Sequence, residues 1–437
     1  MRRFSILLLS ALALALGLAA APVGALTTGQ CLTTVCGGGI KPAVYTDFTQ
    51  GILPSSLYSY SGPSLRTITD ATGAITYAPN NLLTYSSAFN NGVWTASGAT
   101  SNGTDLTEDS TTGQHYFQYS SFTPTIGNAI YWAKIIPRGR TWAVLQVTGA
   151  GPYAWFNVSG AGSVGTVAGG PISTGIVQNL DGSYTCWITV PSSTTSRVQI
   201  NSASANGVAS FAGLNAIALT ILSSGFSAVT YDTTPRPGDQ VGTTSAAYYG
   251  PAFDYAPGWV AGSKPWLRIE GARTNLFLNS GSPATQTITV ANGSTYTVSF
   301  YGTGTLTLSG ALSQTMTGTA GQRTTYTGVA GSTSLTATVS GLSATSYPQV
   351  ELGAFASSSN ATAGSAVARA ADSLTAQGAL STALAAGPWA YKWTAESTLA
   401  TTCVTGSAGA FTWPSYGWMK SLVVYPPGTP TAKVVCK

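Results

Sequence analysis

The residues Asp181-Gly182-Ser183-Tyr184-Thr185-Cys186-Trp187-Ile188-Thr189-Val190 carry the clearest structural signal in this chain. Residues 184–190 are rich in β-branched and aromatic side chains and alternate in character, which predicts a strand with one face toward a core. The Asp-Gly pair before them is a strong signal for a tight hairpin turn. Residues 141–147 predict a strand buried on nearly both faces, and residues 153–158 predict another. We therefore expect continuous β-structure from about residue 80 to residue 236.

A second set of short strands follows after a proline-rich interval. The predicted strands span residues 287–290, 296–301, 305–309 and 335–340, with a tight turn at Asn292-Gly293. Short strands at this spacing, separated by glycine turns, indicate a sandwich or jelly roll. The Ala- and Leu-rich stretch 370–386 allows one short helix. The predicted fold class is all-β, with tandem β-sandwich (jelly-roll-like) modules and an N-terminal signal or anchor helix.

Two similar segments open the two sets of strands. Tyr77-Ala78-Pro79 precedes Asn81-Leu82-Leu83-Thr84-Tyr85-Ser86, and Tyr255-Ala256-Pro257 precedes Thr274-Asn275-Leu276-Phe277-Leu278-Asn279-Ser280. We interpret them as one opening element used twice, with an insertion in the second copy, and hence as tandem related modules.

These patterns divide the chain into six parts. They are a signal peptide (1–25), an extended lead-in (26–75), a first β-sandwich module (76–236), a linker (237–274), a second β-sandwich module (275–372) and a small C-terminal β region (373–437). The linker is assigned from its density of prolines, which are excluded from the interior of sheets.

Composition separates this chain from ordinary soluble proteins. Of its 437 residues only 7% are charged, against about 25% in typical domains. Its hydrophobic content of 44% argues against disorder. Sparse charge with many β-branched residues is typical of extracellular or capsid-like β-structure. The net charge is +5 without any basic run, which argues against a nucleic-acid partner.

The N-terminus has the pattern of an export signal. Arg2 and Arg3 precede an apolar stretch over residues 4–21, and Val23-Gly24-Ala25 offers small residues for cleavage. An uncleaved membrane anchor is the alternative. If this signal is used, we expect the protein outside the cell.

Five cysteines are present. In an oxidising compartment the natural bridges are Cys31 with Cys36 and Cys403 with Cys436, although four cysteines allow three pairings. Cys186 in its strand is expected to be a small buried hydrophobe. With a single histidine and no second close thiol pair, neither a metal site nor a cofactor is predicted.

Catalytic chemistry finds little support. His115 is the only histidine, and no nucleophile motif accompanies it, so no catalytic residue is predicted. The acidic cluster over residues 105–109 is expected to be a solvated loop, with calcium binding as the alternative. Arg268, Glu270 and Arg273 suggest an ion pair that fixes the start of the second module, or else a ligand-facing group.

Aromatic side chains are the remaining candidates for a binding site. A flat ring can cover the apolar face of a sugar while its polar edge forms hydrogen bonds. We single out Trp94, Tyr153 and Trp155 as candidate glycan contacts. For each of them, packing in the core is the alternative.

Several longer segments resemble a known family. They are Phe253-Asp254-Tyr255, residues 267–276, 349–357 and 367–372, and in the first module residues 81–86, 131–134, 154–158 and 181–188. Together, over roughly residues 76–372, they resemble bacteriophage tail-fibre and head-spike proteins whose modules are similar to carbohydrate-binding sandwiches.

The resemblance implies a fibre-like structural protein, on a virion surface or prophage-encoded, that binds host cell-surface glycan. It also implies contacts with other virion or surface proteins and a homo-oligomer, for which a trimer is common. A bacterial secreted adhesin or matrix protein is an alternative that the export signal favours. A glycan depolymerase is a further alternative, and it requires two carboxylates roughly 5–10 Å apart in one groove.

Overall fold

The computed structural model describes residues 40–62, 64–70, 74–120, 127–148, 151–191, 197–230, 234–255, 263–395, 400–414 and 417–436. The protein is mostly β-structure, as predicted, and the only α-helix in these ranges is α1 (Gly378–Ala386). None of the helices in these ranges is long and apolar enough to cross a membrane. The predicted signal peptide over residues 1–25 and the pair Cys31 and Cys36 lie outside the described residues.

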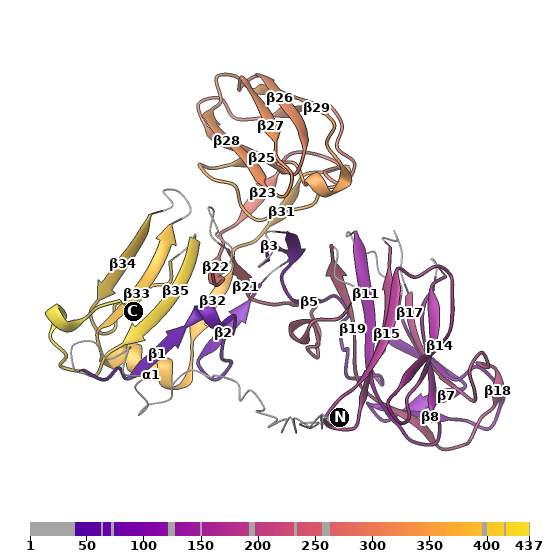
Figure 1. The fold of residues 1–437 in the computed structure, drawn as a ribbon. Helices are drawn as coiled ribbons and strands as arrows, with labels where there is room; N and C mark the ends of the chain where they lie inside the picture. The colour runs from indigo at the N-terminus through magenta and orange to yellow at the C-terminus, as the bar shows by residue number, and fades with distance from the viewer. Residues whose placement is uncertain are drawn as a thin grey trace, which may run out of the picture.

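Three units surround a centre of short strands (Figure 1). The first unit contains two six-stranded antiparallel sheets, in the orders β14-β13-β12-β17-β10-β6 and β15-β16-β11-β19-β8-β7. The first sheet comprises β6 (Trp94–Ser97), β10 (Tyr116–Tyr119), β12 (Trp142–Thr148), β13 (Tyr153–Asn157), β14 (Ser163–Ala168) and β17 (Arg197–Ala203). The second comprises β7 (Ala99–Ser101), β8 (Asp105–Glu108), β11 (Asn128–Pro137), β15 (Ser173–Gln178), β16 (Tyr184–Val190) and β19 (Ile217–Val229).

Both sheets of the first unit contribute to one hydrophobic core. Phe117 and Phe156 reach it from one sheet, and Ile188 and Phe226 reach it from the other. The predicted strand over residues 184–190 is β16, and the Asp-Gly turn before it joins β15 to β16. Gly182 has φ +81° there, a left-handed conformation that glycine adopts without steric cost.

The second unit has two smaller sheets around Phe277, Phe300 and Leu335. Their orders are β24-β29-β26-β27 and β28-β25-β30. Their strands are β24 (Gln286–Thr289), β25 (Thr295–Tyr301), β26 (Gly304–Gly310), β27 (Gln314–Gly318), β28 (Arg323–Val329), β29 (Ser334–Ser340) and β30 (Gln349–Leu352). The predicted turn at Asn292-Gly293 lies between β24 and β25, so it carries the chain from one sheet to the other.

The third unit is a sheet built from distant parts of the chain. It joins β33 (Trp389–Ala395), β34 (Thr401–Gly406) and β35 (Gly417–Val424) to β1 (Val44–Asp47), β21 (Ala252–Asp254) and β22 (Trp266–Ile269). Its core includes Phe48, Leu267 and Leu422. The C-terminal β region is therefore completed by strands from upstream.

This arrangement corrects two expectations from the sequence. The lead-in over residues 26–75 is not only an extended connection, because its described part contains β1, which pairs with β35 at Val44 and Val424. A four-residue strand whose partner lies so far along the chain leaves no local periodicity to detect. Residues 237–274 are not a plain linker, because Pro251 and Pro265 stand directly before β21 and β22, where a proline removes no ladder hydrogen bond.

Short strand pairs and 3₁₀ turns complete the fold, some of them between the units and others within one unit. The paired strands are β2 (Tyr58–Ser61) with β32 (Ser373–Ala376), β3 (Thr67–Thr69) with β4 (Ile75–Tyr77), β5 (Asn80–Asn81) with β20 (Tyr248–Tyr249), β9 (Thr112–Gly113) with β18 (Phe211–Ala212), and β23 (Arg273–Asn275) with β31 (Val367–Arg369). The 3₁₀ turns are η1 (Phe48–Gln50), η2 (Pro237–Asp239), η3 (Ala344–Ser346) and η4 (Thr431–Lys433).

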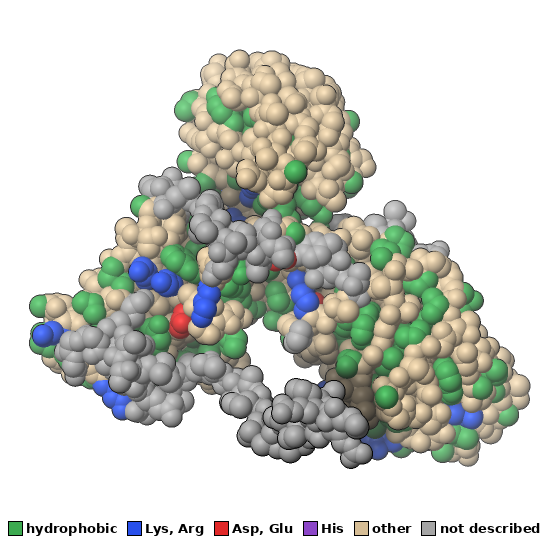
Figure 2. All heavy atoms as spheres, viewed as in Figure 1, with side chains coloured by type: hydrophobic (Ala, Val, Ile, Leu, Met, Phe, Trp, Pro, Cys, Tyr) green, Lys and Arg blue, Asp and Glu red, His purple; other side chains and the backbone are tan. Residues whose placement is uncertain are grey.

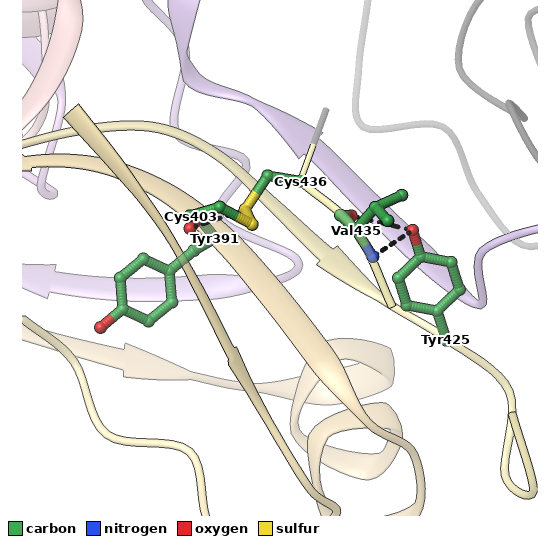
Figure 3. The surroundings of a disulfide bond; sticks show 5 residues. All are labelled: Tyr391, Cys403, Tyr425, Val435 and Cys436. Carbon is green, nitrogen blue, oxygen red and sulfur yellow. Dashed lines mark hydrogen bonds between the residues drawn. A yellow bond between two sulfur atoms is a disulfide. The ribbon is translucent and has the colours of Figure 1, made fainter. Parts of the chain in front are cut away.

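A disulfide fastens the C-terminal segment to the third sheet. It joins Cys403 on β34 to Cys436 (Figure 3), the pairing expected from the sequence. Beside it, the Tyr425 hydroxyl donates a hydrogen bond to the Val435 carbonyl at 2.9 Å. Cys186 is buried and has its thiol free.

The described parts of the two opening elements, residues 81–86 and 274–280, form matching hydrogen bonds, whereas Ala256 and Pro257 lie outside the described residues. The Oδ1 atom of Asn81 accepts hydrogen bonds from the backbone N–H groups of Leu83 and Phe226, each at 3.2 Å. Its Nδ2 group donates to the carbonyls of Ser224 and Val241. In the second unit Asn275 makes the equivalent bonds, accepting from Phe277 and Val350 and donating to Pro348 and Asn360.

A second contact repeats in the same order. The hydroxyl of Ser86 accepts from the N–H of Thr243, whose own hydroxyl donates to the Leu83 carbonyl. Ser280 and Thr362 repeat this pair, with Thr362 donating to the Phe277 carbonyl. Tyr85 and Asn279 occupy equivalent positions with φ +48° and +52°. The similarity between the two segments is therefore a repeated structure, as the sequence suggested.

We predict that Asn81→Ala and Asn275→Ala each destabilise mainly their own unit. Each substitution leaves several buried backbone groups without a partner, which costs roughly 3 kcal/mol or more. Hydrogen exchange measured by mass spectrometry should show faster exchange over residues 80–230 in the first variant and over residues 275–367 in the second. The exposed amide of Gln314 provides the control, since Gln314→Ala should leave both regions protected. Equal loss of protection in both units from one substitution would contradict the prediction.

Six charged side chains are buried together where the units meet. We call this cluster, formed by Arg66, Arg268, Arg369, Asp254, Glu270 and Asp372, the charged junction. Their side chains are between 0% and 5% exposed. Arg268 bonds Asp254 at 2.8 Å and Glu270 at 3.1 Å, Arg369 bonds Glu270 at 2.9 Å, and Arg66 pairs with Asp372.

The charged junction ties distant segments to one point. Arg66 follows β2, and its guanidinium also donates to the Gly250 carbonyl at 3.0 Å. The two ends of the second unit meet there as well, because Glu270 and Asp372 exchange backbone and side-chain hydrogen bonds. Ser358 binds both carboxylate oxygens of Glu270, each at 2.7 Å. The paired strings around residues 268–276 and 369–372 are thus joined in space.

The carboxyl groups of the charged junction do not all shift in one direction. Burial alone would raise the pKa of Glu270, but the surrounding Arg268, Arg369 and Arg66 outweigh it and lower the pKa below its ordinary value of 4.5. Burial dominates for Asp254 and Asp372, and it raises the pKa of both. Glu270 is therefore the firmly ionised centre of the cluster.

We predict that Glu270→Gln lowers the free energy of unfolding by about 3–5 kcal/mol, because it leaves buried guanidinium groups without their counter-charge. Urea unfolding at neutral pH would measure the loss. Asp181→Asn is the matched control, since it removes the partner of Lys134 in an exposed pair and should hardly move the midpoint. A wild-type-like midpoint for Glu270→Gln would contradict the role of the junction.

The same variant should show a defined pH dependence. A carboxyl group whose pKa is lowered on folding stabilises the protein fully above its unfolded pKa, here about 4.5. This contribution is lost as the pH falls through the lowered folded-state pKa. The difference in stability between wild type and Glu270→Gln should therefore stay constant from neutral pH down to about 5 and shrink below that. A difference that grows on acidification would contradict the assignment.

Candidate functional site

The outward side of the first sheet of the first unit carries amide and aromatic side chains. One row across the strands runs Ser97, Tyr116, Asn201, Val144 and Trp155, and the next runs Thr95, Gln118, Gln199, Gln146 and Tyr153. Trp142 on β12 lies in the row beyond Trp155, beside Asn157 and Ala203. We call this surface the amide–aromatic face.

Strand alternation separates the two sides of this sheet. On β12, Ala143, Leu145 and Val147 are in the core, so Trp142, Val144 and Gln146 point outward. On β13, Ala154 and Phe156 are buried, so Tyr153 and Trp155 point outward. The two-residue alternation of the strands thus gives the sheet one hydrophobic side and one side rich in amides.

The centre of the face is buried although it is polar. Gln199 is 5% exposed and Asn201 is 1% exposed, while Tyr116, Gln146 and Trp155 on neighbouring strands are half-buried. The Oδ1 atom of Asn201 and the Nε1 atom of Trp155 have no hydrogen-bond partner among the described residues. A buried polar atom without a hydrogen bond lowers stability by about 1–3 kcal/mol. One acceptor and one donor in the same row could each gain a hydrogen bond from a ligand.

The aromatic groups form a platform at one end of the face. The rings of Tyr153 and Trp155 meet edge to face, with centroids 5.3 Å apart and an interplanar angle of 78°. Tyr116 lies three strands away in the Trp155 row, which corresponds to roughly 14 Å at the usual strand spacing. Such a span accommodates a short oligosaccharide.

Charge is nearly absent from this sheet. None of its six strands contains Asp or Glu, and Arg197 is the one charged residue in them. Figure 2 shows the same trend more widely: on the visible side of the molecule charged side chains are few and scattered. The face can form hydrogen bonds and stacking contacts, and it offers no carboxylate for acid–base work.

Two of the three predicted contacts, Tyr153 and Trp155, lie together on this face. The third, Trp94, is corrected by the structure. It is 5% exposed, it packs against Phe89 and Tyr119, and its Nε1 group donates to the Tyr85 carbonyl at 2.9 Å. Its position on β6 points inward, so it belongs to the core and cannot meet a sugar.

The amide side chains of Gln146, Gln199 and Asn201 were not predicted as part of a site. Strand alternation over residues 142–147 puts Gln146 on the other face of the strand from Leu145, so the outward position of Gln146 could have been read from the sequence. What the sequence does not show is that β17 lies between β12 and β10, which brings Gln199 and Asn201 beside it. Strand order across such separations leaves no local trace.

Other tryptophans of this unit lie on the opposite sheet. Trp132 is fully buried and donates from Nε1 to the Ser227 hydroxyl at 3.2 Å. Its indole covers Gly225, where a Cβ atom would lie within 2.3 Å of the ring, and the indole of Trp187 covers Gly175 in the same way. These two rings fill space over glycines, which leaves them little surface for a ligand.

The acidic cluster over residues 105–109 is not a loop, because Asp105–Glu108 forms β8. Glu108 is 1% exposed, and both its carboxylate oxygens are bound by Arg140. Asp105 accepts a hydrogen bond from the Thr220 hydroxyl at 2.6 Å. The described residues contain no group of three or more His, Cys, Asp or Glu side chains placed to hold a metal ion.

The remaining predicted residues have structural contacts. His115 is buried, with Nδ1 2.5 Å from the Gly98 carbonyl and Nε2 3.2 Å from the Phe211 carbonyl. Arg268 and Glu270 do form the predicted ion pair. Arg273 lies outside the charged junction, where its guanidinium stacks 4.5 Å from the Phe355 ring centroid.

No protein-family model matches the chain, and no curated protein is significantly similar to it.

Proposed function

We propose that the protein is a fibre-like structural protein, on a virion surface or prophage-encoded, whose first unit binds neutral host cell-surface glycan on the amide–aromatic face. The first and second units would each be a β-sandwich of the jelly-roll-like type. The single observation that carries the binding proposal is that Asn201 Oδ1 and Trp155 Nε1 are both buried without a hydrogen-bond partner in one row of this face.

The chemistry of the face supports a sugar in particular. Hydroxyl groups both donate and accept, which matches amide side chains that do the same. The indole and phenol rings supply stacking surfaces for apolar C–H faces. A nearly uncharged sheet suits a neutral ligand, because it leaves no fixed charge to be desolvated.

The apolar and uncharged surfaces also favour assembly. Val167 on the edge strand β14, Val177 on the edge strand β15 and Ile172 between these strands are more than 40% exposed. Such edges are usually covered in an assembled protein. They support the homo-oligomer, with a trimer as the expected form, and contacts with other virion or surface proteins.

A secreted adhesin or matrix protein is the second candidate, which the export-signal pattern at Arg2 and Arg3 favours. A depolymerase acting on this face finds less support, since hydrolysis needs two carboxylates about 5–10 Å apart and the six strands carry none. Sequencing the N-terminus of the mature protein would separate the first two. A start near Leu26 supports secretion, and an intact Met1 inside a particle supports the virion role.

We predict that Trp155→Ala weakens binding of neutral oligosaccharide at least tenfold, equivalent to about 1.4 kcal/mol. The intact wild-type protein would first be screened against an array of neutral and acidic bacterial surface oligosaccharides. The dissociation constant for the best neutral ligand would then be compared by calorimetry. Asn201→Leu should weaken binding similarly, because it removes the buried acceptor.

Trp187→Ala serves as the matched control, since this half-buried tryptophan lies on the opposite sheet of the same unit. Circular dichroism and thermal midpoints would confirm that each variant is folded. Absence of any bound neutral glycan, or an equal loss of affinity in Trp187→Ala, would refute the proposal.

A further inference from the structure

The third sheet has a gap at one residue of its central strand. β33 pairs with β35 along its whole length on one side. On the other side β35 is shared, because β22 pairs up to Met419 and β1 pairs from Ser421 onward. Lys420 lies between these two partners and belongs to neither ladder.

A β-bulge falls at the same residue. In the pairing of β33 with β35, Lys392 faces Ser421 and Trp393 faces Met419, so Lys420 is the extra residue. Bulges turn a side chain away from the regular pleat and recur beside functional sites. Two irregularities on opposite edges of β35 thus coincide at one lysine.

A hollow of about 530 Å³ lies over this gap. Tyr45, Asp47 and Thr49 line it from the side of β1, Ser263, Lys264 and Trp266 from the side of β22, and Lys420 and Ser421 from β35. Its size lies within the roughly 300–1,000 Å³ of small-molecule sites. The lining is hydroxyl groups, two ammonium groups, one carboxylate and two aromatic rings.

The charges of the hollow do not cancel. Asp47 is already engaged, since its two carboxylate oxygens accept from the Thr49 N–H and the Gln50 amide, each at 3.0 Å. Neither Lys264 nor Lys420 forms an ion pair within the part of the chain that the structure describes. Two ammonium groups and the single carboxylate of Asp47 therefore line one hollow, which leaves one positive charge in excess in a chain that is only 7% charged.

An aromatic surface accompanies the positive charge. The Nζ atom of Lys420 lies 5.8 Å from the centroid of the half-buried Trp266 ring, a cation–π arrangement that holds the ammonium beside the indole. A ligand with both a carboxylate and an apolar ring face would satisfy the two features at once.

We propose that this hollow binds a carboxylate-bearing sugar, such as a uronic or sialic acid. The carboxylate would pair with Lys420 and Lys264, the sugar ring would contact Trp266, and the hydroxyl groups would reach Tyr45, Thr49 and Ser263. The site is separate from the amide–aromatic face in unit and in charge preference, so it does not depend on the function proposed above.

The test uses the full-length protein with glucuronic acid and N-acetylneuraminic acid as probes and glucose as the neutral counterpart. Titration calorimetry or saturation-transfer NMR should detect binding of an acidic sugar and none of glucose at the same concentration. Added salt should weaken the binding. Lys420→Gln and Trp266→Ala should each reduce affinity at least tenfold, and Lys264→Gln severalfold.

Two controls separate this site from others. Lys433→Gln alters an exposed lysine of the same unit outside the hollow and should bind like wild type. Trp155→Ala, which tests the amide–aromatic face, should also bind acidic sugar like wild type. Thermal midpoints would show that the variants are folded.

Four results would overturn the inference. These are no binding of either acidic sugar, equal binding of glucose, unchanged affinity in Lys420→Gln, and loss of acidic-sugar binding in Trp155→Ala. Competition by inorganic phosphate at the same affinity would reduce the hollow to a general anion site and would overturn the assignment to sugars. Failure of neutral-glycan binding on the first unit would leave this result untouched.

Discussion

The pairing of Glu270 with Arg268 and Arg369 holds the units of this protein in register. Buried ions are costly unless each has an opposite charge and further hydrogen bonds. Here three arginines face three carboxylates, and Ser358 donates two further hydrogen bonds to Glu270. Six charged residues of a chain that has few of them lie together at this one buried point. Because the members come from residues 66, 254, 268, 270, 369 and 372, the contact forms only when the lead-in and both ends of the second unit have come together.

Outside the charged junction, neutral side chains form the hydrogen bonds that hold the start of each unit to a later part of the same unit. Asn81 and Asn275 each accept a hydrogen bond from the backbone two residues further along and another from a later strand of the same unit, β19 or β30. Asparagine suits this position because one side chain offers both acceptor and donor without a charge. The repetition of this device at Ser86 with Thr243 and at Ser280 with Thr362 shows how one element supports two units of different size.

Local patterns predicted the parts of the fold that depend on neighbours in the sequence. β16, β13, β25 and β29 lie close to the residues that alternation indicated, and the repeated asparagine elements were visible as similar strings. The third sheet was not predictable in this way, because β1 and β22 both pair with β35, far along the chain, and β1 has no other partner strand in the described residues. The residues of the candidate site show the same difference between local and long-range signals. Tyr153 and Trp155 were found from one strand, whereas Gln199 and Asn201 depend on strand order, and Trp94 faces inward for a reason that only its pairing with Tyr119 reveals.

The two candidate binding surfaces follow from how charge is distributed. Arg66, Arg140, Arg268 and Arg369 are committed to buried or half-buried carboxylates, so they add no net field to the exterior. The amide–aromatic face then presents only hydrogen bonds and rings, which select by shape and hydroxyl position. Lys264 and Lys420 are different, because neither forms an ion pair in the described chain and Asp47 is the single carboxylate in their hollow. One positive charge is left in excess there and can attract an anion. The two proposals therefore place neutral and acidic ligands on different sheets of one molecule.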